Sequence, residues 1–187
     1  APVFTEIYSI VFQKKVFSGK AFFGLSLALL GAYTLISQSS FSDTSTTGNL
    51  LAVLCSLAMA VVLIVGKDVR KNVGLLEYSR WVFLGASFCL FFISVAEGVN
   101  VFSFSKNDFG WFVFLAAVPT MVGHNIFYFL VKSLSATTVA AVPLGEPVIS
   151  SLGAYFLFEE PVGMSVFLGG VITLIGVYVV IKNDIGS

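Results

Sequence analysis

The sequence predicts an all-α fold: a polytopic bundle of about seven transmembrane helices. Of the 187 residues, 57% are hydrophobic and only 11% are charged, whereas about 25% of the residues of a soluble domain are charged. The mean hydropathy is +0.98, and apolar stretches recur along the whole chain between short polar loops. Ten basic and ten acidic residues balance, so the chain lacks the basic patch of a nucleic-acid-binding protein, and no nucleic-acid partner is expected.

Six apolar spans follow a first, shorter apolar segment that begins at Ala1. A transmembrane helix needs about 20 apolar residues, so most of the spans are long enough, and the third is short. Because the first segment starts inside an apolar run and has no signal-peptide features, we expect the chain to begin within a helix and further helices to precede it. The expected spans are Ala21–Ser37, Leu50–Gly66, Trp81–Ala96, Gly110–Val131, Ala136–Phe158 and Gly163–Ile181.

Basic residues are concentrated in alternate loops, which predicts the orientation of the chain. Nine of the ten lie on one side and only Lys106 lies in the other loops, and loops rich in Lys and Arg stay in the cytoplasm. The sequence therefore predicts a multi-pass protein of the plasma (cell inner) membrane with a cytoplasmic C-terminus. The nine residues are Lys14, Lys15, Lys20, Lys67, Arg70, Lys71, Arg80, Lys132 and Lys182.

The chain contains an internal repeat. Residues 1–36, moved along by 145 positions, align without a gap on residues 146–181. The first copy has Lys14 and Lys15 where the second has Glu159 and Glu160, so we expect the copies to be inserted in opposite orientations, as in the inverted repeats of many transporters. The alternative is chance similarity between Gly-rich membrane helices. Matching positions are Pro2 and Pro147, Val3 and Val148, Gly24 and Gly169, Leu29 and Leu174, Gly31 and Gly176, Tyr33 and Tyr178, and Ile36 and Ile181.

Two segments resemble a known family. SATTVAAVPLGEPVISSLGAYFLFEEPVGMSVFLGGVITLIGVYVV resembles the end of an EamA domain of the drug/metabolite transporter superfamily, and PVFTEIYSIVFQKKVFSGKAFFGLSLALLGAYTLI resembles the end of a preceding EamA domain. The resemblance implies inverted five-helix repeats and ten helices in the intact protein. Residues 1–37 would be the last two helices of the first repeat, and residues 48–182 the complete second repeat. Ala1 stands where the second copy has Glu146, so a symmetric pair of carboxylates is absent.

The stretch from Ser133 to Pro161 holds the first candidate functional residue. Glu146 lies near the middle of an apolar span and is followed by Pro147, with Pro143 one turn earlier. An ionisable residue at that depth marks a functional site by default. The two prolines predict a broken helix, because proline lacks an N–H and clashes with the carbonyl one turn back. Freed carbonyls are tolerated in a membrane only against protein or a water-filled cavity. The alternative role for Glu146 is a structural clamp on freed backbone donors.

Further polar residues are expected at a similar depth, where transporter sites form between repeats. His124, the only histidine, lies about one turn to the cytoplasmic side of mid-span and suits a proton relay, and Glu6 reaches a similar level if Pro2 and Pro147 lie at equal depth. Tyr128 lies one turn after His124 on the same face. The alternatives are a satisfied packing histidine and an ordinary core tyrosine. Asn125 and Thr120 complete the predicted substrate or proton pathway as polar lining.

The residues argue against an enzyme. A single histidine cannot build a His-rich metal site, and no G-x-S-x-G elbow occurs, so no catalytic residue, metal or cofactor is expected. The favoured function is a secondary transporter that moves a small organic metabolite or drug-like solute by alternating access, as an exporter or exchanger driven by protons or by passive exchange. Its expected partners are this small-molecule substrate, the lipid bilayer and the missing N-terminal helices. The alternative is a seven-helix receptor or another non-transport membrane module.

The charge asymmetry makes a topological prediction. A reporter fused after Ser187 is expected in the cytoplasm, and a tag inserted between Ser39 and Thr47 is expected to be accessible from outside the cell, because basic loops remain inside. Protease protection of the two tags in intact cells measures this. Finding both tags on one side would contradict the orientation and the inverted repeat together.

Overall fold

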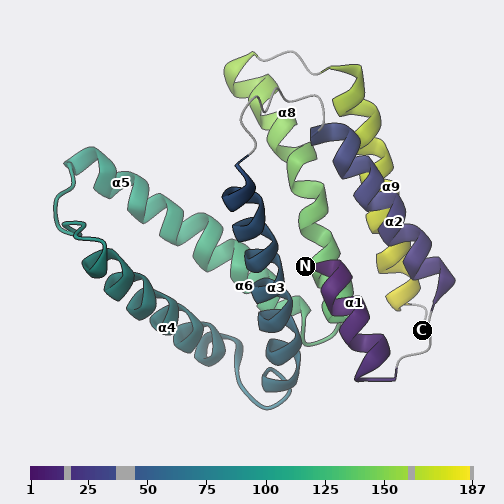
Figure 1. Ribbon diagram of the computed structural model, residues 1–187, viewed down its shortest axis with the longest axis horizontal. Coiled ribbons are helices and arrows are strands. Elements are labelled where there is room, and N and C mark those ends of the chain that lie inside the picture. The colour runs from purple at the N-terminus through teal and green to yellow at the C-terminus, as the bar shows by residue number, and fades with distance from the viewer. Residues whose placement is uncertain (15–17, 37–44, 160–162, 186–187) are drawn as a thin grey trace. The chain divides into compact units, whose positions relative to one another are not determined.

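The computed structural model describes residues 1–14, 18–36, 45–159 and 163–185, and every element within these ranges is a helix (Figure 1). The all-α prediction is confirmed; the predicted positions Lys15, Ser37 and Glu160 lie outside the described residues. The elements are α1 (Pro2–Val11), α2 (Gly19–Ile36), α3 (Thr46–Val69), α4 (Leu75–Ala96), α5 (Lys106–Leu115), η1 (Ala116–His124), α6 (Asn125–Leu130), α7 (Ala136–Ala141), η2 (Val142–Gly145), α8 (Glu146–Phe158) and α9 (Met164–Ile185).

Several of these elements join end to end. The segments α5, η1 and α6 form one helix over Lys106–Leu130, and α7, η2 and α8 form another over Ala136–Phe158. The described chain therefore has seven continuous helices, of which five are long and apolar enough to cross a membrane, while α1 and α2 are shorter apolar helices. A polytopic helical membrane protein, as the sequence predicts, is confirmed.

The third predicted span begins later than the helix that contains it. The apolar run starts at Trp81, whereas α4 starts at Leu75. Hydropathy locates only the apolar part of a helix, but the first turns of α4 also hold Glu77 and Arg80. Gly74 precedes the helix with extended backbone angles, and Glu77 lies in the first turn, where the helix dipole favours an acidic side chain. The polar first turns therefore extend α4 beyond its apolar part.

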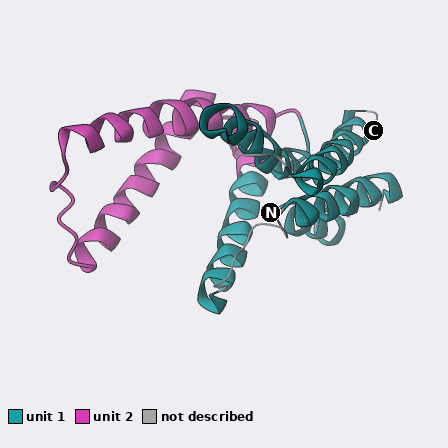
Figure 2. Ribbon diagram, turned by 90° about the horizontal axis from the view of Figure 1, so that it is seen from above, with its two compact units in different colours: residues 1–65, 134–187 teal, residues 66–133 magenta. Residues whose placement is uncertain are grey.

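The chain divides into two compact units, which are described separately (Figure 2). Unit 1 comprises residues 1–65 and 134–187 and contains α1, α2, most of α3, and α7 through α9. Unit 2 comprises residues 66–133 and contains the end of α3, α4 and the continuous helix from α5 to α6.

Glycines bring α2 and α9 of unit 1 into close antiparallel contact (Figure 1). A Cβ built on Gly24 would lie 3.0 Å from the Gly176 carbonyl oxygen, and one on Gly176 would lie 2.6 Å from the Gly24 carbonyl oxygen. Toward the other end of the contact, a Cβ on Gly31 would lie 2.7 Å from the Gly169 oxygen, and one on Gly169 would lie 2.8 Å from the Gly31 oxygen. Side chains do not fit at such distances, so the helices meet backbone to backbone, a mode of association used inside membranes.

The remaining helices of unit 1 pack around this pair through small or polar side chains. All six residues of α7 are buried, and α7 packs against α1. The buried face of α1 consists of Pro2, Thr5, Glu6 and Ser9. Leu25 of α2, Ala141 of α7 and Val180 of α9 form a small apolar cluster that Leu144 covers. The interior of unit 1 is thus built from short side chains that allow close helix approach.

In unit 2, Arg70 ties the end of α3 to α6. Its side chain is buried; Nε donates to the Tyr128 carbonyl oxygen at 3.1 Å, and Nη1 donates to the Val73 carbonyl oxygen. The Tyr78 ring meets the Tyr128 ring edge-on at 5.1 Å. A Cβ on Gly66 would lie 2.7 Å from the Tyr78 hydroxyl, so a glycine there makes room for this ring. The guanidinium is satisfied by carbonyls near helix ends, where a positive charge is favoured.

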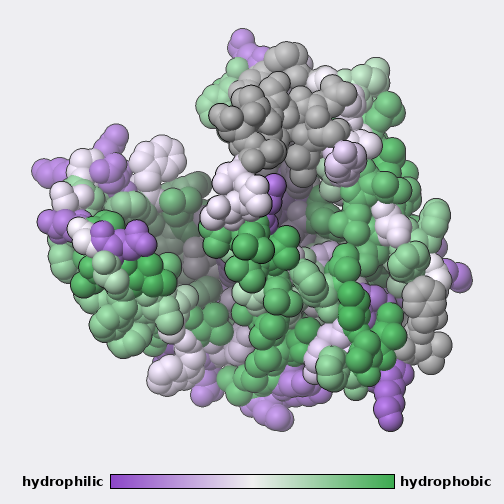
Figure 3. Space-filling view, in the orientation of Figure 1, coloured by the Kyte–Doolittle hydropathy of each residue, from purple (hydrophilic) through white to green (hydrophobic). Residues whose placement is uncertain are grey.

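Large apolar side chains cover the outside of both units rather than their interiors (Figure 3). In the five candidate spans, only 6–33% of the most apolar window is buried. An apolar surface of this extent fits hydrocarbon, which solvates Leu and Phe as well as a protein core does.

The α2–α9 contact predicts a sharp position dependence for glycine substitutions. Gly31→Ala is expected to lower the free energy of unfolding by about 1–3 kcal/mol, because the new methyl group overpacks a backbone contact. Gly85→Ala on α4 is the matched control: a Cβ there meets nothing within 4 Å, and alanine is the better helix former. Unfolding midpoints in detergent measure both variants. Equal midpoints for the two would contradict the close contact.

Candidate functional site

The helix over Lys106–Leu130 widens into a π-helix at Ala116–His124, which contains Pro119. Proline removes a backbone donor and displaces the carbonyl one turn back, so the normal ladder cannot continue through this position. Wide turns of this kind are frequent at functional sites. The sequence analysis did not predict this segment, and Pro119 is the signal from which an irregular helix could have been expected.

Three of the predicted pathway residues bond to backbone carbonyls of this widened segment. Thr120 Oγ1 donates to the Leu115 oxygen at 3.0 Å, and Asn125 Nδ2 donates to the Met121 oxygen at 2.6 Å. His124 Nδ1 lies 3.1 Å from the Pro119 oxygen. Since a carbonyl only accepts, Nδ1 must carry the proton in this contact, which leaves Nε2 of a neutral His124 as a free acceptor.

Among these three residues, Asn125 has a buried side-chain oxygen, Oδ1, that lacks a hydrogen-bond partner within the described residues. A buried acceptor without a partner is rare in native proteins and calls for an explanation. A bound molecule that donates a hydrogen bond to Asn125 Oδ1 would be such an explanation.

A cavity of about 330 Å³ lies between α4 and the η1–α6 segment, and Asn125 lines it. Ser79, Phe83 and Ser87 of α4 face the same cavity. The sequence analysis did not single out these three residues, although their spacing of four places them on one helix face. The cavity is lined by Leu76, Ser79, Arg80, Phe83, Leu84, Ser87, Met121 and Asn125.

Aromatic rings surround His124 and Tyr128. Tyr128 is only 3% exposed, and the His124 ring lies 6.4 Å from the Tyr128 ring and 6.4 Å from the Phe83 ring. Tyr128 thus packs among aromatic side chains while His124, next to it, is exposed. The structure brings Thr120, His124, Asn125 and Tyr128 of unit 2 into one stretch, as their spacing predicts.

Glu146 lies in unit 1, at the point where its helix changes geometry. Val142–Gly145 form a 3₁₀ turn that includes Pro143, and the Glu146 amide donates to the Pro143 oxygen. The backbone stays right-handed through Ala141, Gly145 and Glu146, so the helix tightens at its prolines and does not unwind. A 3₁₀ bond from residue i+3 replaces one bond of the α-helical ladder that proline removes.

The Glu146 side chain is exposed, and no hydrogen bond or ion pair to it is found within the described residues. Beyond it, Ser151 Oγ donates to the Pro147 oxygen at 2.8 Å. The carboxylate at the start of α8 is therefore available to a ligand, to solvent or to another part of the protein.

Glu6 lies on the buried face of α1 and is 8% exposed. Its Oε2 atom has no hydrogen-bond partner within the described residues, and neither has Oγ1 of Thr137 on the neighbouring helix α7. Glu6 and Glu146 belong to unit 1, while His124 belongs to unit 2, so a common layer of the three remains a prediction. The described residues contain no group of three or more His, Cys, Asp or Glu that would hold a metal ion.

The helices and their apolar surfaces define a multi-pass membrane protein, and comparison with known proteins gives its family. The family described as the EamA-like transporter family matches residues 46–182. The chain belongs to this family, whose name describes transporters rather than enzymes.

Relatives of this chain are also named as transporters. A protein of Archaeoglobus fulgidus named an uncharacterized transporter is 24% identical over 183 residues, which make up 98% of this chain and 65% of that protein. A second from the same organism, with the same name, is 25% identical over 96% of this chain and 63% of its own length. The chain thus spans just under two thirds of these relatives. No solved structure matches it significantly.

The unpartnered oxygen of Asn125 makes a prediction about stability and function. Asn125→Leu is expected to leave the unfolding midpoint nearly unchanged, because relief of the desolvation cost of Oδ1 offsets the loss of the bond from Nδ2 to the Met121 oxygen, while it lowers the transport rate of the intact protein. Ser133→Leu, on an exposed residue after α6, is the control for adding a leucine in unit 2. A midpoint several degrees lower in Asn125→Leu would make this residue a structural one.

Proposed function

We propose that the intact protein is a secondary transporter that moves a small organic metabolite or drug-like solute across the plasma membrane by alternating access, as an exporter or exchanger. Family membership and the multi-pass fold support the transporter class. The C-terminus lies in the cytoplasm in this proposal, as the distribution of basic residues predicts.

The α2–α9 contact is the observation that carries the proposal. Gly24 meets Gly176, and Gly31 meets Gly169. Residues 145 positions apart are equivalent in the internal repeat, so Gly24 is equivalent to Gly169 and Gly31 to Gly176. Replacing each glycine of the first pair by its equivalent therefore gives the second pair. The contact is therefore self-complementary, as expected at a two-fold axis between equivalent surfaces. Because α2 and α9 run antiparallel, this axis lies across the helices, which is the symmetry of an inverted repeat.

An inverted repeat gives a transporter two related halves that rock about a site near the middle of the membrane. Residues 1–37 belong to the first half in this proposal and residues 48–182 form the second. The relatives are longer than this chain, and three further helices complete the first half in this proposal.

The proposed solute pathway uses polar groups available at two irregular helices. Asn125 Oδ1 and His124 Nε2 are acceptors next to the π-helix, and Glu146 is an unpaired carboxylate after the 3₁₀ turn. These acceptors suit a solute that carries hydrogen-bond donors, such as hydroxyl or amino groups.

Glu146→Gln tests the pathway in the intact protein. Metabolites released by cells with and without the protein identify a transported solute, and its flux is then measured in proteoliposomes. The variant is expected to lower flux at least about tenfold, since a neutral amide replaces the anion at an exposed site where a charge-assisted hydrogen bond is worth at least about 1.5 kcal/mol.

Glu97→Gln is the matched control, because Glu97 is an exposed carboxylate that follows the end of α4. Its flux is expected to equal that of the natural protein. Undiminished flux in Glu146→Gln, with both variants folded and inserted, would remove Glu146 from the pathway. A failure of any solute to move would contradict the transporter proposal itself.

A further inference from the structure

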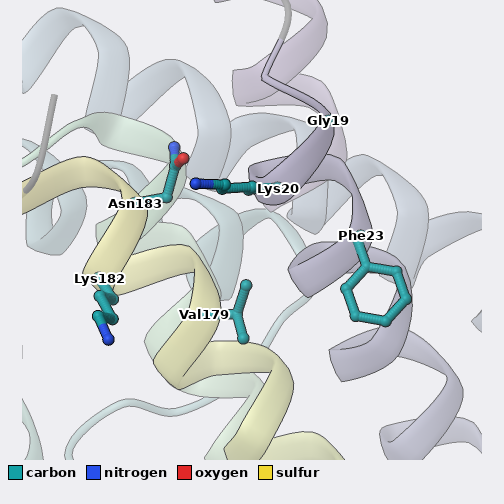
Figure 4. Close-up of a pocket in the computed structure, with 6 residues that line it drawn as sticks. All are labelled: Gly19, Lys20, Phe23, Val179, Lys182 and Asn183. Carbon is teal, nitrogen blue, oxygen red and sulfur yellow. The ribbon is translucent and has the colours of Figure 1, made fainter.

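A second cavity, of about 520 Å³, opens in unit 1 where α2 begins and α9 ends (Figure 4). It is separate from the polar groups of the proposed solute pathway. The two helices run antiparallel, so this end of the pair lies at one surface of the bilayer. The cavity is lined by Gly19, Lys20, Phe23, Val179, Lys182 and Asn183.

The lining of this cavity is polar at the helix ends and apolar one turn deeper. Lys20 lies at the start of α2 and Lys182 in the last turn of α9, whereas Phe23 and Val179 lie about one turn farther into the membrane. No acidic side chain is among the described residues that line it. The neighbouring Asp184 accepts a hydrogen bond from the Ser135 amide at 2.7 Å, which engages its carboxylate with α7. The occupant best matched to this lining has a negative head and an apolar tail.

At the polar end, the Lys20 side chain of α2 approaches Asn183 of α9, whereas the Lys182 ammonium points away from both (Figure 4). Ser18 Oγ donates to Asn183 Oδ1 at 3.0 Å, which leaves the Asn183 amide group as a donor. The Lys182 ammonium lies 5.8 Å from the centre of the Tyr178 ring and is exposed. An anion at this end would therefore find donors from both helices.

We propose that this cavity binds an anionic phospholipid, with its phosphate between Lys20 and Asn183, near Lys182, and the start of an acyl chain against Phe23 and Val179. Basic pockets between transmembrane helices on the cytoplasmic side bind anionic headgroups in this way. The apolar wall selects a lipid over free phosphate. A bound lipid bridges α2 and α9 and so reinforces their contact. This proposal requires the membrane location of the chain and is independent of the transported solute.

Lipid binding to the purified full-length protein tests the proposal. Native mass spectrometry and unfolding midpoints in detergent are compared with added phosphatidylglycerol, phosphatidylcholine or inorganic phosphate. Phosphatidylglycerol is expected to bind and to raise the midpoint, and the other two are not. Lys20→Gln combined with Lys182→Gln is expected to weaken phosphatidylglycerol binding at least about tenfold, because each lysine near an anionic headgroup contributes to the attraction.

Two further variants make the outcome decisive. Lys106→Gln with Lys132→Gln removes the same charge from exposed residues of unit 2 and is expected to keep the lipid response. Gly19→Leu fills the cavity without changing charge, since a Cβ there meets nothing within 4 Å, and is expected to lose the response while remaining folded. Equal binding of phosphatidylcholine, an equal shift with phosphate alone, or an undiminished response in the double lysine variant and Gly19→Leu would overturn the proposal.

Discussion

The backbone contact between α2 and α9 is the constraint on which the described part of unit 1 depends. Lipid tails are as apolar as leucine, so helices inside a membrane gain little by burying large apolar side chains against each other. Association must then come from close packing and from hydrogen bonds. Gly24, Gly31, Gly169 and Gly176 provide the close packing, because each lacks the Cβ that would clash with the backbone of the facing helix. The apolar cluster of Leu25, Ala141 and Val180 then joins α7 to the pair.

The polar groups of the proposed solute pathway lie at or next to the two irregular helical segments, η1 and η2, and not in the close contact between α2 and α9. In unit 2 the π-helix carries the bonds of Thr120, His124 and Asn125 to backbone carbonyls. In unit 1 the 3₁₀ turn precedes Glu146. Both irregular segments contain a proline, and both lie within continuous helices long and apolar enough to cross a membrane. The proposed solute-binding groups therefore lie at or next to a π-helix in unit 2 and a 3₁₀ turn in unit 1.

Much of the fold follows from the sequence because hydropathy is a direct measure of the bilayer constraint. The seven helices were predicted from the lengths of the apolar stretches, and the structure confirms them. The start of α4 was misplaced because Glu77 and Arg80 interrupt the apolar pattern without interrupting the helix. The π-helix at Ala116–His124 was not predicted, since hydropathy carries no information on how a helix accommodates Pro119.

The candidate site was less accessible to sequence reasoning. The shared face of His124 and Tyr128 follows from helical periodicity, but the unpartnered oxygen of Asn125 and the cavity shared with Ser79 and Ser87 depend on how α4 packs against α6. Glu146 was predicted to lie near the middle of its span, and the structure shows its side chain exposed on unit 1. Depth within a span does not say which way a side chain points. The convergence of Glu6, Glu146 and His124 remains a prediction.

Cysteine cross-linking across α2 and α9 tests the central claim most directly, since it reports the antiparallel contact in the membrane. In a full-length protein whose exposed Cys55 and Cys89 are replaced by serine, Ser18→Cys is paired either with Asn183→Cys or with Met164→Cys. A disulfide needs Cα atoms within about 7 Å, and Ser18 bonds to Asn183, whereas Met164 begins α9 at its far end. The account predicts efficient oxidation of the first pair and none of the second. Cross-linking of the second pair in place of the first would contradict the antiparallel contact and, with it, the inverted repeat.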